Sequence, residues 1–528
     1  MTTPLELLQT TFGYEAFRPG QEKIINAVLG GRDCIGVMPT GAGKSITFQI
    51  PAKILSGTVL VISPLISLMK DQVDSLLQNG FRATVINSTL SYEEKSLRLK
   101  AFQRGEYELV YLAPEALESG LRTFLKRCPV RLLVVDEAHC ISQWGHEFRP
   151  SYRKIAGLKA ELGNLPVLAL TATATRTVAI DIIKQLGMVK PDGYKGSFFR
   201  SNLLITCQKK GNGRNTRNDI LSLVRQRRGQ TGIIYCMSRK AVMATVEFLC
   251  AHGIRALPYH AGLSDLDRSS HQEAFAKDET DVMVATVAFG MGIDKSNVRY
   301  VIHRDMPKSL ENYCQEIGRA GRDGLPSDCI LFYSWSDLIN YERFLKEMQD
   351  MEMAALIHQK TVEMFRWADK AVCRHKGITA YFEEKINDCG SSCDICRKMT
   401  LEDMVLPSER IAPTRPMRVV PIGSDVMTPV VGTSTTVRRH VETIPSAEIG
   451  TPDLSSDGLF AQLKKLRRSL ADAQGVPAYI VFSDAVLLQM MQRHPKTSEE
   501  FLKVPGVGPA KLARYGATFL RVLNQVEE

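Results

Sequence analysis

The 528-residue sequence lacks a hydrophobic run of the roughly 20 residues that a membrane-spanning helix needs. Its first residues, MTTPLELLQTTFGYEAF, also lack the basic stretch followed by an apolar run that is typical of a secretory signal peptide, and they do not look like a transit peptide. These absences exclude the usual signals for export and membrane insertion. We therefore expect a protein without a membrane partner that is cytoplasmic and, in a cell without a nucleus, associated with the nucleoid.

The sequence is also poor in cysteines that stand in pairs. Of its twelve cysteines, eight stand singly, which predicts reduced thiols and not a disulfide framework. These eight are Cys34, Cys128, Cys140, Cys207, Cys236, Cys250, Cys314 and Cys329.

The remaining four cysteines form a cluster with the spacing C-x15-C-x3-C-x2-C. They are Cys373, Cys389, Cys393 and Cys396. Four thiolates in a reducing compartment suit a tetrahedral structural Zn²⁺ ion. An Fe–S cluster is the alternative that the same thiolates allow, whereas a disulfide pair is not expected in such a compartment.

The charge is moderately unbalanced, since 67 Lys and Arg residues outnumber 57 Asp and Glu residues and give a formal net charge of +10. A positive excess favours a nucleic-acid partner. A mildly basic enzyme without such a partner fits the charge alone equally well. The hydrophobic fraction of 44% is large enough for sizeable cores.

Short apolar runs rich in Val, Ile and Leu alternate with amphipathic stretches from about residue 20 to 200, and a second such series begins near 230. Runs such as GTVLVISP and VRLLVVDEAH are typical of buried parallel strands connected by helices. The sequence therefore predicts two α/β units in tandem, joined near 200–210. A helical stretch, a proline-rich segment that we expect to be a flexible linker, and a small all-α segment follow.

The segment MPTGAGKS follows one predicted strand and precedes a predicted helix. Its glycines allow backbone amides to turn toward phosphate oxygens, and its lysine and serine can reach the β- and γ-phosphates and Mg²⁺. The strict pattern has glycine where this chain has Met38, but the core of the motif is present. This core, the phosphate loop, predicts an ATP-binding site and not a simple glycine-rich turn; it consists of Thr40, Gly41, Ala42, Gly43, Lys44 and Ser45.

Two groups of charged residues complement the phosphate loop. Asp136 and Glu137 stand at the carboxyl end of a predicted strand, where Asp136 can hold Mg²⁺ together with Ser45, and Glu137 can deprotonate an attacking water. Arg319 and Arg322 are three residues apart in QEIGRAGRDG and share a helix face. Because they belong to the second α/β unit, they can reach the γ-phosphate only when the units close, as arginine fingers do. A solvated basic helix is the alternative.

These motifs, in this order, resemble those of the superfamily 2 helicases and, within them, the RecQ DNA helicase family. The resemblance covers about 1–400 and 458–525 and rests on FRPGQ, TGAGKS, SPLISLMKDQV, DEAH, TATAT, ATVAFGMGIDK and QEIGRAGRDG. It implies an α/β fold with two tandem RecA-like domains with parallel sheets, a helical zinc-binding subdomain and a small all-α HRDC-like domain. The expected limits are 1–205 and 206–345 for the RecA-like domains, 346–403 for the zinc-binding subdomain, 404–457 for the linker and 458–528 for the HRDC-like domain.

The resemblance also implies roles for further residues. Tyr14 would stack on adenine while Arg18 and Gln21 hold its edge, and Gln315 would join the catalytic interface between the domains. Trp144 would contact bases from the loop that follows the DEAH box, unless it is a packing residue. The residues implied in DNA binding or in coupling it to ATP hydrolysis are Ser63, Lys70, His139, Trp144, Phe148, Arg149, Arg153, Thr171, Thr173 and His260.

Two regions after the zinc-binding subdomain are informative. Many RecQ proteins carry a winged helix there, but 404–457 is too short and too rich in proline for a domain of roughly 100 residues, so we expect it to be missing. The HRDC-like segment contains VPGVGPAKLARYG, whose glycine-rich turn lets backbone amides approach a phosphate, which predicts auxiliary DNA binding. A protein contact or a structural role is the alternative.

Together, the motifs and the resemblance imply a monomeric ATP-dependent DNA helicase with ATP, Mg²⁺ and Zn²⁺ as cofactors. We expect it to bind single-stranded and partially duplex DNA, to move 3′ to 5′ and to unwind duplexes in DNA repair and recombination. No protein partner is predicted. The alternatives are a translocase or a strand-annealing scaffold that unwinds poorly without a winged helix, and an RNA helicase.

Overall fold

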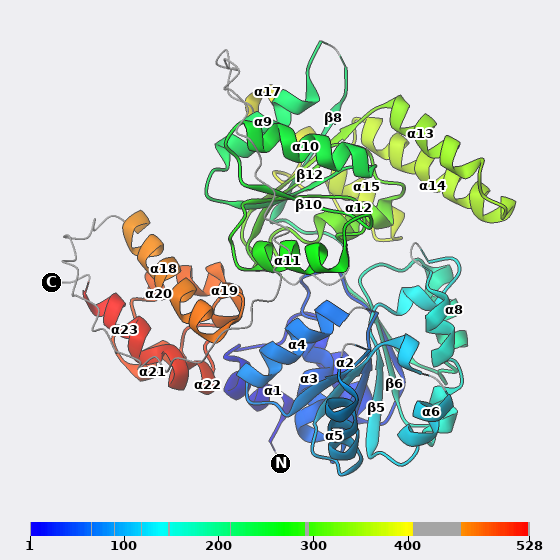
Figure 1. Cartoon of the computed structure of the whole chain (residues 1–528), viewed down its shortest axis with the longest axis vertical. Helices are drawn as coiled ribbons and strands as arrows, with labels where there is room; N and C mark the ends of the chain where they lie inside the picture. Colours follow the sequence, from blue (N-terminus) through cyan, green and yellow to red (C-terminus); the bar gives the residue numbers. More distant parts are fainter. Residues whose placement is uncertain are drawn as a thin grey trace, which may run out of the picture.

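The computed structural model describes residues 2–64, 66–88, 90–117, 119–145, 148–211, 213–290, 295–404 and 456–525. Within these residues, no helix is both long enough and apolar enough to cross a membrane. Two α/β domains form the bulk of the chain, and an all-helical unit lies beside the first of them (Figure 1). The expected linker, apart from its end residues, lies outside the described residues.

The first sheet has seven parallel strands in the order β3-β4-β2-β5-β6-β1-β7. Val59 and Leu60, which are neighbours in one strand, belong to different buried clusters. Both faces of the sheet are therefore covered, which is why its strands are continuous hydrophobic runs in the sequence. The strands are β1 (Cys34–Val37), β2 (Thr58–Ile62), β3 (Ala83–Ile86), β4 (Leu109–Leu112), β5 (Val130–Val135), β6 (Val167–Thr171) and β7 (Asp192–Lys195).

The helices of the first domain connect these strands, as expected for parallel pairing. They are α1 (Pro4–Leu7), η1 (Leu8–Phe12), α2 (Gln21–Leu29), α3 (Ile46–Ile54), α4 (Ile66–Gln78), α5 (Tyr92–Gln103), η2 (Pro114–Ala116), α6 (Ser119–Leu125), η3 (Ala138–Ile141), η4 (Pro150–Ile155), α7 (Leu158–Glu161) and α8 (Arg176–Gln185).

The second sheet has six parallel strands in the order β10-β11-β9-β12-β13-β8. The chain enters this sheet at its edge, where β8 pairs with β13. Its strands are β8 (Leu203–Lys209), β9 (Thr231–Tyr235), β10 (Ala256–Tyr259), β11 (Val282–Ala285), β12 (Val298–His303) and β13 (Ser327–Tyr333). Its helices are α9 (Thr216–Gln226), α10 (Arg239–Ala251), α11 (Asp265–Ala276) and α12 (Leu310–Ile317).

The cysteine cluster belongs to a helical subdomain that packs on β8. Figure 1 shows α13 and α14 as a helical hairpin that projects from the second domain. The rings of Phe198 and Phe382 stack with centroids 3.9 Å apart, and Cys393 forms an isolated bridge with Ile205 of β8. The helices are α13 (Trp335–Leu345), α14 (Met351–Asp369), α15 (Arg374–Tyr381), α16 (Asp394–Arg397) and α17 (Leu401–Met404).

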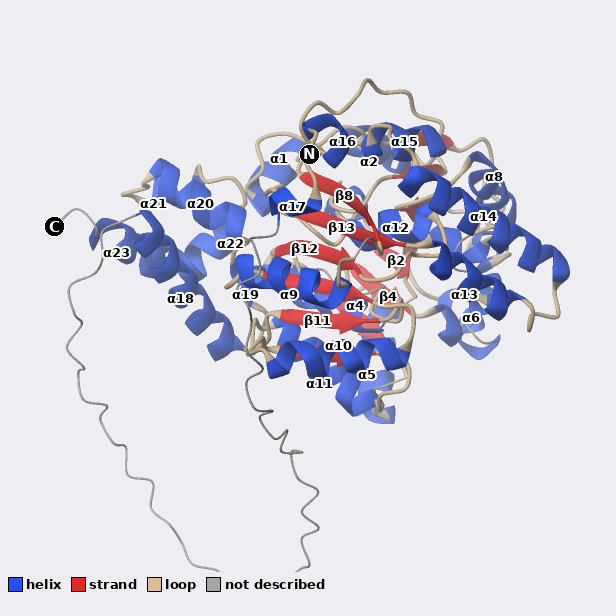
Figure 2. Cartoon of the chain, turned by 90° about the horizontal axis from the view of Figure 1, so that it is seen from above, coloured by secondary structure: helices blue, strands red, loops and turns tan. Residues whose placement is uncertain are grey.

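The C-terminal unit is all helical and has its own core. Phe482 meets Phe501, Tyr515 and Phe519 in edge-on contacts, with ring centroids 5.1–6.1 Å apart. Both views show the unit as a separate body beside the core (Figures 1 and 2). Its helices are α18 (Ser456–Gln474), α19 (Ala478–Val481), α20 (Asp484–Arg493), α21 (Ser498–Leu502), α22 (Pro509–Lys511), η5 (Leu512–Gly516) and α23 (Ala517–Asn524). The predicted fold class, with two parallel sheets, a helical cysteine module and a small all-α unit, is confirmed.

Candidate functional site

The phosphate loop connects β1 to α3. Gly41 and Gly43 have φ angles of 84° and 77°, a left-handed conformation that favours glycine. A Cβ atom on Gly43 would lie 2.5 Å from Nε2 of Gln21, so this glycine also permits a close contact. α3 begins directly after Ser45 and directs its N-terminus at the loop, which is a favourable place for phosphate.

Asp136 and Glu137 follow β5 at the same edge of the sheet, since the carboxyl ends of parallel strands lie together. Oε1 of Glu137 lies 3.6 Å from Nζ of Lys44, and both side chains are largely buried. Glu137 has a φ of 46°, which is unusual for a residue with a side chain, and the Tyr152 hydroxyl donates a 2.9 Å hydrogen bond to the Asp136 carbonyl. The strained turn and the buried tyrosine fix where the two carboxylates point.

His139 connects this carboxylate to the end of β6. Its Nδ1 lies 2.9 Å from Oγ1 of Thr171 and 3.4 Å from Oε2 of Glu137. The Thr171 hydroxyl donates to the carbonyl of Thr173 at 3.1 Å, so we assign the imidazole proton to Nδ1. Burial, followed by the charges of two nearby cations, lowers the pKa of His139 to about 3. His139 is therefore a neutral imidazole that contacts Thr171 through a hydrogen bond and not through charge.

A cavity of about 410 Å³ lies between the two domains and brings the predicted catalytic residues together. Its wall from the second domain comes from α12 and the turn after it, where Arg319 is buried. The predicted catalytic residues that line the cavity are Lys44, Asp136, Glu137, Gln315, Arg319 and Arg322. The second domain therefore completes a site that the first domain leaves open on one side.

The residues expected to hold adenine lie at the same cavity. Tyr14 lines it with a partly exposed ring, 38% accessible. Arg18 donates to the carbonyl of Gly41, and Nε2 of Gln21 donates to the carbonyl of Gly43 at 2.9 Å. The Arg18 amide donates back to Oε1 of Gln21, also at 2.9 Å. The motif thus contacts the phosphate loop directly.

The C-terminal unit forms a third wall of this cavity, which the sequence did not predict. The glycine-rich turn predicted to approach DNA packs against the segment before Tyr14 instead. The amide of Gly506 donates to the carbonyl of Gly13 at 3.1 Å, and a Cβ atom on Gly508 would lie 2.5 Å from the carbonyl oxygen of Thr11. The residues of the C-terminal unit that line the cavity are Tyr479, Ile480, Ser483, Val486, Gly506 and Lys511.

A second contact holds the C-terminal unit to the first domain. The buried hydroxyl of Tyr515 lies 2.8 Å from Oε1 of Gln78 at the end of α4 and 2.7 Å from Oε1 of Gln474. Nε2 of Gln78 also donates a hydrogen bond to Oε1 of Gln474 at 3.3 Å. The glycines of the turn are the one sequence feature that could have predicted this interface. Close backbone contact requires glycine as much as phosphate binding does.

The aromatic loop, residues 140–153, follows the DEAH box at the carboxyl edge of the first sheet. Its Trp144 side chain is 52% exposed, which fits a ring that is open to a ligand better than a packing residue. The Arg153 guanidinium lies 5.0 Å from the ring centre of Phe148, within range of a cation–π contact. Arg149 donates to the carbonyl of Pro64 at 3.1 Å. Two residues of the loop, 146 and 147, lie outside the described residues.

The remaining residues expected at DNA differ in exposure. Lys70 is exposed on α4, whereas Ser63 is almost fully buried directly after β2. His260 is buried too, and burial followed by the charge of Arg239 lowers its pKa. Its Nδ1 accepts a hydrogen bond from the amide of Gly262 at 3.2 Å.

The four clustered cysteines fit a tetrahedral metal site. Their ligand atoms all lie within 4.8 Å of one another, and the sulfurs of a zinc site with roughly 2.3 Å bonds are about 3.8 Å apart. The amide of Cys389 donates to Sγ of Cys373 at 3.3 Å, and that of Cys396 donates to Sγ of Cys393 at 3.5 Å. Such amides stabilise thiolates, so the surroundings suit Zn²⁺ as well as the ligand set does.

Two basic residues beside the cysteines have structural partners. Arg374 and His375 are both buried. The Arg374 guanidinium pairs with Asp394 at 2.9 Å and donates to the carbonyl of Ala368 at 2.8 Å. Nε2 of His375 lies 3.0 Å from the carbonyl oxygen of Leu203. Arg374 therefore stabilises the cysteine module from within, and His375 ties it to β8 of the second domain.

Four family models match successive parts of the chain. The DEAD/DEAH box helicase model matches 18–180, and the helicase conserved C-terminal domain matches 215–324. The RecQ zinc-binding model matches 335–397, which includes the cysteine cluster, and the HRDC model matches 456–523.

Among solved structures, Mss116p bound to ssRNA and AMP-PNP matches 64% of this chain and 73% of its own, with a TM-score of 0.51 and 20% identity. The Mycobacterium smegmatis helicase Lhr bound to ssDNA and AMP-PNP matches 64% of this chain and 48% of its own, with a TM-score of 0.50 and 21% identity. At such identities the likeness shows the fold alone.

Curated relatives match nearly the whole chain. The ATP-dependent DNA helicase RecQ of Pasteurella multocida (strain Pm70) is 36% identical, and the match covers 99% of this chain and 94% of that protein. RecQ of Bacillus subtilis (strain 168) is 39% identical over 98% of both chains. Since these relatives are more than 30% identical over nearly the whole chain, and the RecQ zinc-binding and HRDC models match as well, the chain belongs to the RecQ family of ATP-dependent DNA helicases.

Proposed function

We propose that this protein couples ATP hydrolysis to 3′-to-5′ movement along single-stranded DNA and to the unwinding of duplex DNA. The observation that carries the proposal is the shared cavity, in which Lys44 and Glu137 of the first domain lie with Arg319 and Arg322 of the second. An ATPase site that only the second domain completes changes the spacing of the two domains in every cycle. A DNA strand held across both domains moves with that change.

Each residue of the site has a role that follows from its chemistry. Lys44 neutralises the β- and γ-phosphates, and Ser45 and Asp136 would hold Mg²⁺, which would neutralise further phosphate charge. Glu137 takes the proton of the attacking water. Arg319 and Arg322 stabilise the charge that develops on the γ-phosphate, and Gln315 orients the same region.

The DNA side of the proposal rests on the aromatic loop. Trp144 offers an exposed face for base stacking, and Arg149 and Arg153 offer positive charge for phosphates. The neutral His139 lies between this loop and Glu137, so that a shift of the loop on DNA reaches the attacking water. We propose that Ser63, Lys70, Thr171, Thr173 and His260 complete the DNA-contacting and coupling set.

The expected absence of a winged helix favours a second candidate function. The match to the Pasteurella protein runs over 595 positions, more than the 528 residues of this chain, so that relative has internal segments that this chain lacks. We propose that a winged helix after the zinc-binding subdomain is among them. An enzyme without it translocates on DNA but separates strands less efficiently. We further propose that it acts as a monomer at the nucleoid, on single-stranded and partially duplex DNA, in repair and recombination.

Unwinding of tailed duplexes tests the proposal. We expect strand separation of a 3′-tailed DNA duplex, little or none of a 5′-tailed DNA duplex, and none of an RNA duplex. Lys44→Ala and Glu137→Gln should abolish DNA-stimulated ATPase activity and unwinding while leaving DNA binding within about twofold of the wild type. Unwinding retained by either variant would overturn the proposed function. ATPase activity and movement on DNA without strand separation would establish the translocase.

A further inference from the structure

Arg200 lies in the segment that connects the two domains, between β7 and β8. It belongs to none of the sequence motifs. The structure places its guanidinium between the phosphate loop of the first domain and the turn of the second domain that carries Arg319 and Arg322. We call this turn, residues 318–324, the arginine loop.

The contacts of Arg200 reach both sides of the cleft. Its Nη1 donates to the carbonyl of Thr40 at 3.2 Å, on the phosphate loop, and to the carbonyl of Gly318 at 3.4 Å. Its Nη2 donates to the carbonyls of Ala320 and Gly321, at 3.2 and 2.6 Å. One guanidinium therefore joins one carbonyl of the phosphate loop to three carbonyls of the arginine loop.

The two loops also touch each other where Arg200 joins them. A Cβ atom on Gly318 would lie 1.9 Å from Oγ1 of Thr40, a distance that no side chain can occupy. The approach of the loops thus depends on glycine at this position. Because the contact forms only when the two domains are together, it is a marker of the closed cleft.

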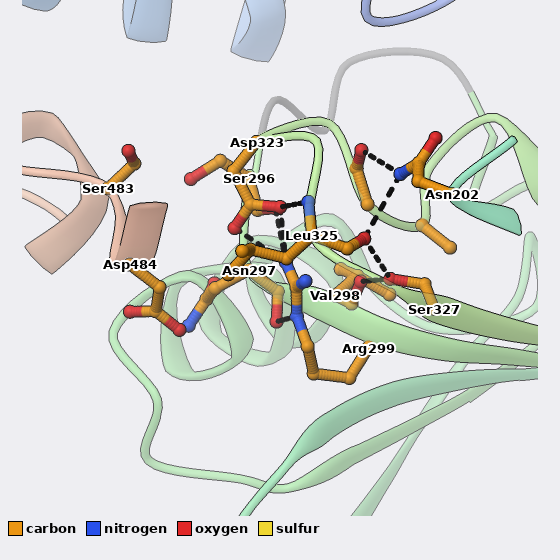
Figure 3. A network of polar contacts seen from close by, with 12 residues as sticks. Asn202, Ser296, Asn297, Val298, Arg299, Asp323, Leu325, Ser327, Ser483 and Asp484 are labelled. Carbon is orange, nitrogen blue, oxygen red and sulfur yellow. Dashed lines mark hydrogen bonds and ion pairs between the residues drawn. The ribbon is translucent and has the colours of Figure 1, made fainter. Parts of the chain in front are cut away.

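Contacts within the second domain fix the conformation of the arginine loop. Because of them, a displacement of its carbonyl groups moves the loop as a unit. Figure 3 shows Asn202 and Arg299 on two sides of the loop. Nδ2 of Asn202 donates to the carbonyls of Gly321 and Leu325 at 2.9 and 3.0 Å, and Arg299 pairs with the buried carboxylate of Asp323 at 2.6 Å. Arg200 therefore grips a preformed turn.

The charge environment of Arg200 is unusual for a structural arginine. Among the described contacts, its partners are backbone carbonyls and the side-chain oxygen of Asn202 at 3.3 Å, and no carboxylate lies within ion-pair range. Burial first, and the charges of Arg322 and Arg18 in addition, lower its pKa to about 10. The charge of Asp323 acts in the opposite direction but forms no ion pair with Arg200 among the described contacts, so the buried cation depends on the carbonyls around it.

We propose that Arg200 is a positioning residue that couples closure of the phosphate loop to delivery of the arginine loop, and so sets the rate of ATP hydrolysis without binding the nucleotide itself. The inference rests on the proposed function, because it assigns Arg319 and Arg322 to the hydrolysis step. Its mechanism is geometric. The planar fork of a guanidinium reaches both sets of carbonyls at once, which the single ammonium of a lysine does not.

Three variants test this role. Arg200→Gln removes the charge and the fork, Arg200→Lys retains the charge alone, and Gly318→Ala forces the two loops apart from the opposite side. Arg225→Gln, at an exposed arginine of α9, is the matched control. We expect Arg200→Gln to lower kcat of DNA-stimulated ATP hydrolysis at least about tenfold, with the Kd for a fluorescent ATP analogue within about twofold of the wild type.

The position of the loops is read out by hydrogen exchange with Mg²⁺ and adenylyl imidodiphosphate. In the wild type and the control, the analogue should slow exchange in both the phosphate loop and the arginine loop. In Arg200→Gln and Gly318→Ala it should protect the phosphate loop alone. The double variant should be no slower in ATP hydrolysis than the worse single variant, because both changes break one contact. Thermal unfolding and zinc content show whether each variant is folded. If Arg200→Gln is not folded, Gly318→Ala still tests the contact between the phosphate loop and the arginine loop.

Three outcomes would overturn the inference. They are a wild-type kcat in Arg200→Gln, full rescue by Arg200→Lys, and retained protection of the arginine loop in both single variants. Glu137→Gln, measured in parallel, separates this failure from that of the proposed function. If Glu137→Gln abolishes hydrolysis while Arg200→Gln does not, the inference alone fails. If Glu137→Gln hydrolyses ATP normally, the proposed function fails.

Discussion

His139 is fully buried between the carboxylate of Glu137 and the hydroxyl of Thr171. Its pKa of about 3 in the folded protein is lowered mainly by burial, whereas an unfolded histidine titrates near 6.5. Between these values the unfolded chain binds a proton that the folded chain does not. The contribution of His139 to stability is therefore complete above about pH 6.5 and is lost as the pH falls toward 3.

We predict that acid destabilises the wild type more steeply than His139→Gln. Each pH unit below 6.5 removes about 1.4 kcal/mol of this contribution, so the two unfolding free energies should converge by about 2 kcal/mol between pH 7 and pH 5. Denaturant unfolding at each pH measures this difference. Zinc content is followed in the same samples, because protonated thiols release metal in both proteins alike. Parallel curves for the two proteins would show that folding does not shift the pKa of the imidazole.

At the scale of elements, the aromatic loop joins a phosphate-transfer site to an exposed ring. We predict that Trp144→Ala leaves ATP binding intact but lowers the stimulation of ATPase activity by single-stranded DNA at least about tenfold, since stacking contributes about 1–3 kcal/mol per base. Trp335→Ala is the matched control, because Trp335 is equally exposed, at 57% against 52%, but lies on α13. Normal stimulation and normal unwinding in Trp144→Ala would make Trp144 a packing residue.

The glycine turn of the C-terminal unit is a second element with a testable contact. Gly508→Ala would place a methyl group against the carbonyl of Thr11, so we expect it to detach the turn from the segment before Tyr14. Hydrogen exchange at residues 11–14 and 505–508 should accelerate at least about tenfold. Gly120→Ala is the control, because its Cβ atom would meet no atom within 4 Å in an exposed helix. Unchanged exchange would mean that the turn is not docked in solution and is available to DNA.

At the scale of the whole molecule, the excess of positive charge should appear as salt dependence. The formal net charge is +10. We predict that the Kd for single-stranded DNA rises at least tenfold between 50 and 200 mM salt, because lysine and arginine side chains that bind phosphates release the counterions of the DNA. Fluorescence anisotropy with a labelled oligonucleotide measures this, with KCl and potassium glutamate as parallel series. A flat response would mean that stacking and not phosphate contact dominates binding.

Local patterns predicted the first domain well. The phosphate loop and Glu137 lie at the carboxyl ends of β1 and β5 because parallel strands place these ends on one edge, so a motif after a hydrophobic run already has a position. The cysteine cluster was equally predictable, since its spacing carries the chemistry. Arg319 and Arg322 were predicted to reach the γ-phosphate when the two units close, and both line the cavity, although they lie just beyond the end of α12 and not on it. The sequence left a solvated basic helix open as the alternative, because nothing in this local stretch reveals the opposite domain.

Contacts between distant segments were not predictable from pattern. Arg200 binds carbonyl oxygens, which every residue has, so its partners leave no trace in the sequence. Arg374 and His375 stand in a basic run of the sequence, yet both are buried. Arg374 pairs with an acidic residue 20 positions further along the chain, and His375 with a backbone carbonyl of β8, so both have structural partners. The sequence predicts that the turn at Gly506 and Gly508 approaches phosphate, and the structure shows it packed against the first domain, because backbone docking and phosphate binding require the same small residue.

The edge position of β8 has a consequence for folding during synthesis on the ribosome. β8 is the first strand of its sheet to leave the ribosome, yet its one neighbour in the sheet is β13, the last. Roughly 120 residues separate the end of one from the start of the other, which corresponds to about 6–24 s of translation at 5–20 residues per second. Throughout that interval an apolar strand has an open edge and no partner. Chaperones that shield nascent chains should therefore engage this protein most when its middle third has emerged.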